Sequence, residues 1–103
     1  MVTKKEVIKF LNENKEFLKV NFHITKIGLF GSFAKDKEKE QSDIDIIIEF
    51  EENTSDISEI KQQLRNYIRE NLKRDVDICR EKYLKPYIKN KILKKTIYVG
   101  GGK

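Results

Sequence analysis

Apolar residues recur along this chain with two different periods. A period near 3.6 residues marks three segments, which are residues 4–20, residues 56–72 and a last segment that begins at Pro86. Thr3 is followed three positions later by Glu6, a spacing that is typical of a capping box at the start of a helix. Proline is tolerated in the first helical turn, so Pro86 suits the start of the last segment. We therefore expect three helices, each with one apolar side.

Four shorter segments predict strands, because apolar and β-branched residues dominate them. They are residues 24–30, 42–50, 74–79 and 96–99. The first is apolar on both faces at its end, which is typical of a strand in the middle of a sheet. The alternation of helices and strands predicts an α/β (α+β) fold: a small mixed sheet of three to four strands with helices packed on it.

The length of 103 residues is that of one domain, and no repeat or linker divides the chain. We expect a single domain over residues 1–99 and a disordered tail over residues 100–103. Apolar and charged residues each make up 38% of the chain, which predicts a thin core under a heavily charged surface. The net charge of +5 suits an anionic partner such as a nucleotide, although Lys-rich helix surfaces that only solubilise the chain explain it as well.

Cys79 is the only cysteine, so no disulfide can form within the chain. We interpret it as a small apolar residue rather than as a nucleophile. The first residues are too polar for a signal peptide, and no apolar run approaches the roughly 20 residues that cross a bilayer. These features predict a soluble cytoplasmic protein.

The most unusual segment is residues 27–48, IGLFGSFAKDKEKEQSDIDIII. Asp43 and Asp45 stand two apart at the start of an Ile-rich run. In a strand they share one face, with Cβ atoms roughly 6.5 to 7 Å apart. Unpaired carboxylates at that distance repel, and a bound divalent cation makes the arrangement favourable. Taken alone, the pair is also typical of a loop end or a helix cap.

Two further features add to this pattern. Gly31 and Ser32 follow the first strand and predict a short helical turn whose backbone N–H groups could bind a phosphate. Asp77 lies in the third predicted strand and shares its face with Asp75 and Cys79. A third carboxylate thus occurs in an apolar strand, as Asp43 and Asp45 do.

The combined motif is Gly-Ser, ten residues, then Asp-x-Asp, carried by GSFAK…SDIDI. With it the chain resembles the minimal nucleotidyltransferase (MNT) family of the DNA polymerase beta-like superfamily, over nearly its whole length. The resemblance implies ATP as substrate, Mg²⁺ as cofactor in a two-metal site, and the polymerase beta-like nucleotidyltransferase fold. It implies that Asp43, Asp45 and Asp77 are catalytic and bind metal, with Asp75 the less favoured substitute for Asp77. It also implies that Gly31, Ser32 and Lys35 bind the nucleotide.

Two positions depart from the family pattern. Lys35 replaces the usual Arg and so lacks the forked guanidinium that binds phosphate at two points. Asp36 stands where the family commonly has Gly, and it adds negative charge close to the expected phosphates. Both departures predict weaker triphosphate binding, while the carboxylates of the metal site are intact.

The 103 residues leave no room for an acceptor domain beside this one, so we expect the acceptor to belong to a partner or to a second copy. The resemblance implies an antitoxin that transfers AMP from ATP to a tyrosine hydroxyl on a HEPN-domain toxin. The alternative is an MNT chain with little or no catalytic activity that neutralises its partner by binding alone. We also considered a nucleic-acid binder that uses the Lys-rich last helix, but the chain lacks aromatic residues arranged to stack bases. Phe33 and Tyr98 are predicted to be exposed, which favours a homodimer or a complex with another protein.

Overall fold

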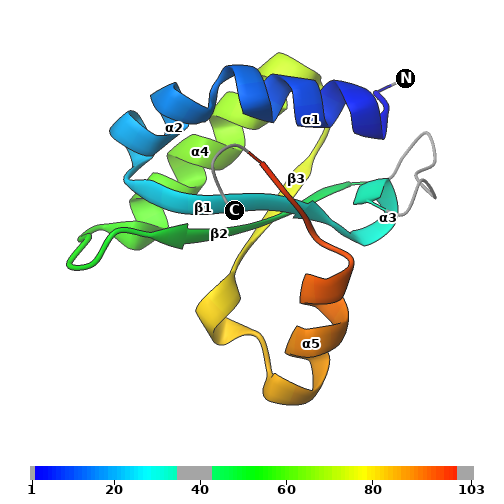
Figure 1. Ribbon diagram of the computed structural model, residues 1–103. Helices are drawn as coiled ribbons and strands as arrows, with labels where there is room; N and C mark the ends of the chain where they lie inside the picture. Colours follow the sequence, from blue (N-terminus) through cyan, green and yellow to red (C-terminus); the bar gives the residue numbers. More distant parts are fainter. Residues whose placement is uncertain (1, 35–42, 100–103) are drawn as a thin grey trace.

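The computed structural model describes residues 2–34 and 43–99, and Figure 1 shows their arrangement. Residues 35–42, between the Gly-Ser turn and Asp43, and the predicted tail over residues 100–103 lie outside this range. The elements, in chain order, are α1 (Lys4–Glu13), α2 (Lys15–Phe22), β1 (Ile24–Phe30), α3 (Gly31–Ala34), β2 (Ile44–Phe50), α4 (Ile57–Leu72), β3 (Val76–Arg80), the 3-10 helix η1 (Glu81–Tyr83), α5 (Pro86–Lys94) and β4 (Ile97–Tyr98).

The four strands form one mixed sheet in the order β3-β2-β1-β4. β1 pairs antiparallel with both β2 and β4, whereas β2 and β3 run parallel. A parallel pair needs a long crossover, and α4 supplies it between β2 and β3. β1 is a central strand, and both the fold class and the bounds of this strand agree with the sequence prediction. β2 begins two residues later than predicted, and β3 runs over residues 76–80 rather than 74–79.

Helices α1, α2 and α4 cover one face of the sheet, as Figure 1 shows. The core lies between these helices and the inward side chains of the strands, among them Ile44, Ile46 and Ile48 of β2. Phe33 is also fully buried in this core, so the prediction that it is exposed was wrong. The short turn of α3 directs this ring inward, where its burial removes a large apolar surface from water.

The segment predicted as one helix forms two helices, because the helix is interrupted at Asn14. The Asn14 side-chain amide donates a hydrogen bond to the carbonyl oxygen of Phe10 at 2.8 Å. Its side-chain oxygen accepts another from the hydroxyl of Tyr67 in α4 at 2.9 Å. A side chain that competes with the backbone in this way favours a helix end over a helix interior. The partner on α4 lies far along the chain, which is why local spacing did not predict the break.

The opposite face of the sheet is covered in part by η1 and α5 (Figure 1), while β4 pairs with β1 at the edge of the sheet. Gly28 permits the close approach of β4, because a Cβ atom there would come within 2.6 Å of Cγ2 of Thr96. Ile47 of β2 is fully buried on this side. Since neighbours along a strand alternate faces, Asp45, Ile47 and Glu49 all point toward η1 and α5.

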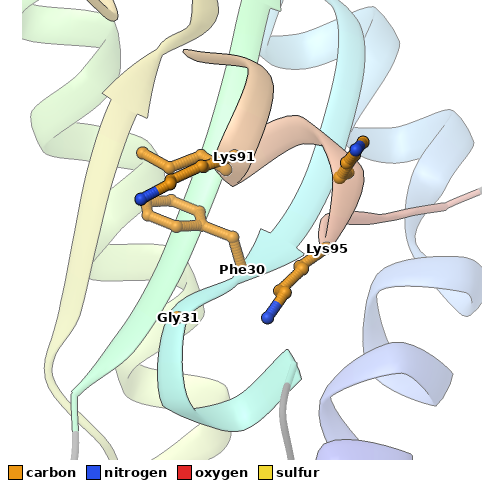
Figure 2. Close-up of a pocket in the computed structure, with 6 residues that line it drawn as sticks. Phe30, Gly31, Lys91 and Lys95 are labelled. Atoms are coloured by element: carbon orange, nitrogen blue, oxygen red, sulfur yellow. The ribbon is translucent and has the colours of Figure 1, made fainter. Parts of the chain in front are cut away.

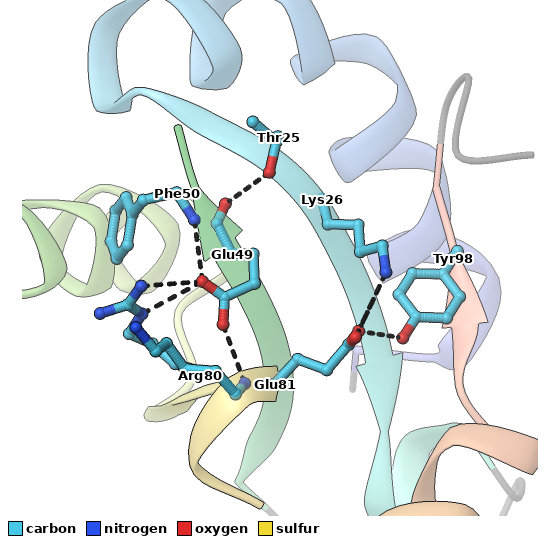
Figure 3. Close-up of polar contacts among 8 residues, drawn as sticks. Thr25, Lys26, Glu49, Phe50, Arg80, Glu81 and Tyr98 are labelled. Atoms are coloured by element: carbon cyan, nitrogen blue, oxygen red, sulfur yellow. Dashed lines mark hydrogen bonds and ion pairs between the residues drawn. The ribbon is translucent and has the colours of Figure 1, made fainter. Parts of the chain in front are cut away.

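Polar contacts attach η1 to this second face, as Figure 3 shows. The Glu49 carboxylate accepts hydrogen bonds from Nη2 of Arg80 and from the backbone N–H of Lys82, both at 2.9 Å. The Glu81 carboxylate accepts from Nζ of Lys26 at 3.3 Å and from the hydroxyl of Tyr98 at 2.8 Å. These contacts connect β1, β2, β3 and β4 through η1 and so hold the chain that leads into α5. None of the helices that the structure describes is long and apolar enough to cross a membrane.

Candidate active site

Asp45 of β2 and Asp77 of β3 are partners in the parallel ladder. Register partners on adjacent strands point to the same face and lie about 4.8 Å apart. The backbone N–H of Ile44 donates to the carbonyl oxygen of Asp75 at 2.9 Å, which aligns the starts of the two strands. The structure therefore brings together two of the three carboxylates that the sequence marked, on the face of the sheet that α5 partly covers.

On its other side, Asp45 is paired with Phe30, the last residue of β1. Phe30, Asp45 and Asp77 thus form a row across three strands on one face of the sheet. Gly31 follows Phe30 with a φ of +76°, in the region that favours glycine. A Cβ atom at Gly31 would collide with the Asp45 carboxylate, 2.9 Å from its Cγ atom. The absence of a side chain at Gly31 therefore lets the turn after β1 lie directly against Asp45.

Asp43 lies just before β2 and is exposed. Burial raises the pKa of the Asp45 carboxyl above its ordinary value, and the negative charges of Asp77 and then Asp43 raise it further. The three carboxylates are thus near enough for two of them to oppose ionisation of the third. A cation in this place would relieve that repulsion.

The donor set can be compared with the needs of Mg²⁺. Within residues 2–34 and 43–99, no three Asp, Glu, His or Cys side chains form a ready-made cluster for a metal ion. Mg²⁺ is commonly held by one or two carboxylates together with phosphate oxygens and water, rather than by an all-protein cage. The adjacent carboxylates of Asp45 and Asp77, with the raised pKa of Asp45, fit an ion that binds together with a nucleotide.

The other two candidates near Asp77, which are Asp75 and Cys79, are arranged differently. Asp75 precedes the strand and forms an exposed ion pair with Arg69 of α4, with Nε and Oδ1 3.4 Å apart. This contact directs it toward the helix, whereas Asp77 is the register partner of Asp45. Burial raises the pKa of the Cys79 thiol, and the charge of Asp77 raises it further, so the nucleophilic thiolate is disfavoured.

The structure describes two of the three residues that the sequence suggested for nucleotide binding. Gly31 and Ser32 are the first two residues of the α3 turn. Lys35 and Asp36, the two departures from the family pattern, lie outside the described residues. Their effect on the site stays a prediction.

A cavity of about 540 Å³ lies beside Gly31, as Figure 2 shows. Its lining comes from the junction of β1 with α3 and from the C-terminal part of α5 with the residue after it: Phe30, Gly31, Lys91, Ile92, Lys94 and Lys95. The sequence indicated that the last helix has a basic side. It gave no sign that this side faces the Gly-Ser turn, because that depends on how η1 attaches to the sheet.

A model of the nucleotidyltransferase domain matches residues 7–99. The chain belongs to the nucleotidyltransferase family. This confirms the resemblance that the Gly-Ser and Asp-x-Asp motifs indicated, and it identifies this protein as an enzyme of the nucleotidyltransferase class.

Two relatives span almost the same length as this nucleotidyltransferase. A Methanocaldococcus jannaschii protein, named provisionally as a protein adenylyltransferase, is 36% identical over 96% of this chain and all of its own length. Protein adenylyltransferase MntA of Thermococcus cleftensis is 34% identical over 96% of this chain and 98% of its own.

Solved structures show the same fold. A structure described provisionally as a minimal nucleotidyltransferase superposes with a TM-score of 0.76 at 25% identity, covering 93% of this chain and 95% of the other. A toxin–antitoxin structure with AMP-PNP has a TM-score of 0.67 at 20% identity, over 99% of this chain and 76% of the other. A Shewanella oneidensis MNT antitoxin in complex with a tri-AMPylated HEPN toxin has a TM-score of 0.59 at 23% identity, over 90% and 72%. At these identities the last two comparisons bear on the fold alone.

Proposed function

We propose that this nucleotidyltransferase transfers AMP from ATP to a tyrosine hydroxyl of a HEPN-domain toxin and thereby acts as its antitoxin. The observation that carries the proposal is the register pair of Asp45 and Asp77, with Gly31 packed against Asp45. Relatives of similar length are named protein adenylyltransferases, which supports a protein as the acceptor. The absence of a disulfide partner for Cys79 is consistent with our expectation of a cytoplasmic protein.

Each part of the proposed site has a distinct role. Asp45 and Asp77, with Asp43 at the open edge, would hold Mg²⁺ in a two-metal site. The turn that begins with Gly31 and Ser32, together with Lys35, would bind the nucleotide. When bound, Mg²⁺ supplies neutralisation of the phosphate charge and a lowered pKa of the acceptor hydroxyl.

The transfer itself is a displacement at the α-phosphorus of ATP. The tyrosine oxygen bonds to this phosphorus, the bond from the phosphorus to the bridging β-phosphate oxygen breaks, and pyrophosphate leaves with the electron pair. The phenolic proton passes to a carboxylate oxygen of Asp77, which is more exposed than Asp45, and from there to water. Asp45 and Asp77 are fixed by the strand ladder, so little reorganisation is needed when the reactants arrive.

Transfer of labelled AMP from ATP to a cognate HEPN protein tests this function. Replacing Asp43 and Asp45 with Asn should reduce the transfer rate at least about hundredfold, because the charge that binds the cation is lost. A matched control replaces Glu52 and Glu59 with Gln, since both are exposed and lie at the other end of β2. Unchanged transfer by the Asp43 and Asp45 variant would show that the proposed metal site is wrong.

The alternative function is neutralisation by binding alone. It is favoured by two exposed aromatic residues on the α5 side, Tyr83 and Tyr87, whose exposed fractions are 70% and 73%. Such residues are enriched at protein interfaces. Co-expression with the toxin separates the two functions: the Asp43 and Asp45 variant would still protect cells if binding suffices, and would fail to protect them if transfer is required. Tyr98 is half-buried, so the prediction that it is exposed was wrong. The homodimer that rested on it stays a prediction.

A further inference from the structure

The cavity between β1 and α5 has lysines on one wall and adjoins the carboxylate pair. Lys91, Lys94 and Lys95 all line it and are exposed. Among its lining residues in the described part of the chain, none is acidic. Three lysine side chains that line one hollow add positive charge to its surroundings, which favours an anion.

The position of these lysines at the end of a helix has a simpler explanation as well. Cations near a helix C-terminus are favoured by the helix dipole, typically by about 0.3–1 kcal/mol each. That effect accounts for Lys91 and Lys94 in the last turn of α5. The helix dipole does not explain why the last turn of α5 faces a cavity that Phe30 and Gly31 line on the other side. The charge and the hollow together therefore call for a ligand.

Gly31 connects the cavity to the candidate active site. It lines the cavity, and the position of its missing Cβ is taken by the Asp45 carboxylate. Phe30, on the same wall, is the register partner of Asp45. Figure 2 shows Lys91 beside the Phe30 ring and Lys95 reaching toward the turn at Gly31. A ligand that reaches the carboxylates can thus extend past Gly31 to the lysines.

We propose that this cavity binds the polyphosphate tail of the nucleoside triphosphate, with Lys91, Lys94 and Lys95 as its counter-charges. The inference rests on the proposed function, because it assigns the β- and γ-phosphates of the same substrate to α5. It makes the site selective for triphosphates over monophosphates, since AMP has no tail to occupy the cavity. It also gives α5 a part in the reaction, because the electron pair released at the α-phosphorus goes to a pyrophosphate that the lysines stabilise.

Calorimetric titration in EDTA tests the cavity separately from the metal site. The probes are inorganic tripolyphosphate, ATP and AMP. The pocket variant carries Lys91→Gln, Lys94→Gln and Lys95→Gln. Because several charge-assisted contacts are lost, it should bind tripolyphosphate and ATP at least about tenfold more weakly than the unchanged protein, with little change for AMP.

A control variant with Lys5→Gln, Lys9→Gln and Lys19→Gln has the same change in net charge. These three lysines are exposed on α1 and α2, on the other side of the sheet. The control variant should bind tripolyphosphate within about twofold of the unchanged protein, because long-range effects of exposed charges are screened by salt. An equal loss in both variants, or no loss in the pocket variant, would overturn the proposal.

Two further measurements distinguish a failure of the lysine proposal from a failure of the proposed function. Replacing the same three pocket lysines with Arg retains the charge, and it should restore tripolyphosphate binding. Failure of this rescue in a folded protein, verified by circular dichroism, would also count against the cavity as the phosphate site. The proposed function fails differently: AMP transfer would survive Asp43→Asn and Asp45→Asn, whatever the lysine variants do to tripolyphosphate binding.

Discussion

Asp45 and Asp77 lie side by side in a parallel strand pair, although the whole of α4 separates them along the chain. The ladder holds the two carboxylates on one face of the sheet. Their proximity is unfavourable by itself, since Asp77 is among the causes that raise the pKa of Asp45. The fold thus keeps a repulsion between two carboxylates that lowers its stability and that a bound cation would remove. Such a loss of stability is common at functional sites.

The repulsion between Asp45 and Asp77 predicts that removing one of the two charges stabilises the fold. Asp45→Asn, measured by urea denaturation in EDTA near pH 7, should raise the free energy of unfolding by a few tenths to about 1 kcal/mol, because a repelling and partly exposed charge is lost. The same variant should lose transferase activity.

The pH dependence of the unchanged protein provides the check on Asp45. A carboxyl whose folded pKa is raised binds its proton more tightly in the folded state, so its contribution to stability is full below the unfolded pKa near 3.8 and falls as pH rises through the folded pKa. Asp45→Asn should remove this part of the dependence. A variant less stable than the unchanged protein in EDTA would contradict the electrostatic interpretation.

The contact of Gly31 with Asp45 predicts a second effect. Gly31→Ala should lower the free energy of unfolding by about 1–3 kcal/mol, because alanine is strained at positive φ. It should also weaken ATP binding, since the new methyl group must displace the Asp45 carboxylate. Both are measurable, by urea denaturation and by calorimetry with ATP and Mg²⁺.

A double-mutant cycle isolates that contact. If the methyl group acts by displacing Asp45, Gly31→Ala should cost less stability in an Asp45→Ala background than in the unchanged protein. Equal costs in both backgrounds would show that backbone strain alone is responsible. Gly28→Ala serves as a comparison, because its Cβ would meet the side chain of Thr96 rather than a carboxylate.

Much of this site followed from the alternation of faces along strands. The period of two placed Asp43 with Asp45 and Asp77 with Asp75, and the apolar run of β1 indicated a central strand. The preference for Asp77 over Asp75 came from the family resemblance. The rest depended on contacts between distant segments. The break at Asn14 involves Tyr67 of α4, and the position of the lysine cavity depends on where η1 attaches. Phe33 was misjudged because only the direction of the α3 turn decides whether that ring is buried.

The attachment of η1 through Glu49 predicts an acid-sensitive stability. Burial alone would raise the pKa of Glu49, but hydrogen bonds from the backbone N–H of Lys82 and from Arg80 outweigh it and lower the pKa. Its contribution to stability is therefore present above the unfolded value near 4.5 and is lost as pH falls through the folded pKa.

The substitution Glu49→Gln measures that contribution. It should lower the free energy of unfolding at pH 7 by about 1–3 kcal/mol, because the largely buried Arg80 loses its charged partner. The difference from the unchanged protein should shrink when unfolding is measured at progressively lower pH, below about 4.5. An unchanged difference across that range would contradict the assignment. Glu51→Gln, at an exposed carboxylate nearby, should have little effect.

The most direct test compares two aspartates that stand two positions apart. Asp77→Asn and Asp75→Asn make the same chemical change, but only Asp77 is the register partner of Asp45. Labelled AMP transfer to the cognate HEPN protein should fall at least about hundredfold for Asp77→Asn and by less than about threefold for Asp75→Asn. Equal rates for the two variants, or a larger loss for Asp75→Asn, would contradict a catalytic site built on the pairing of Asp45 with Asp77.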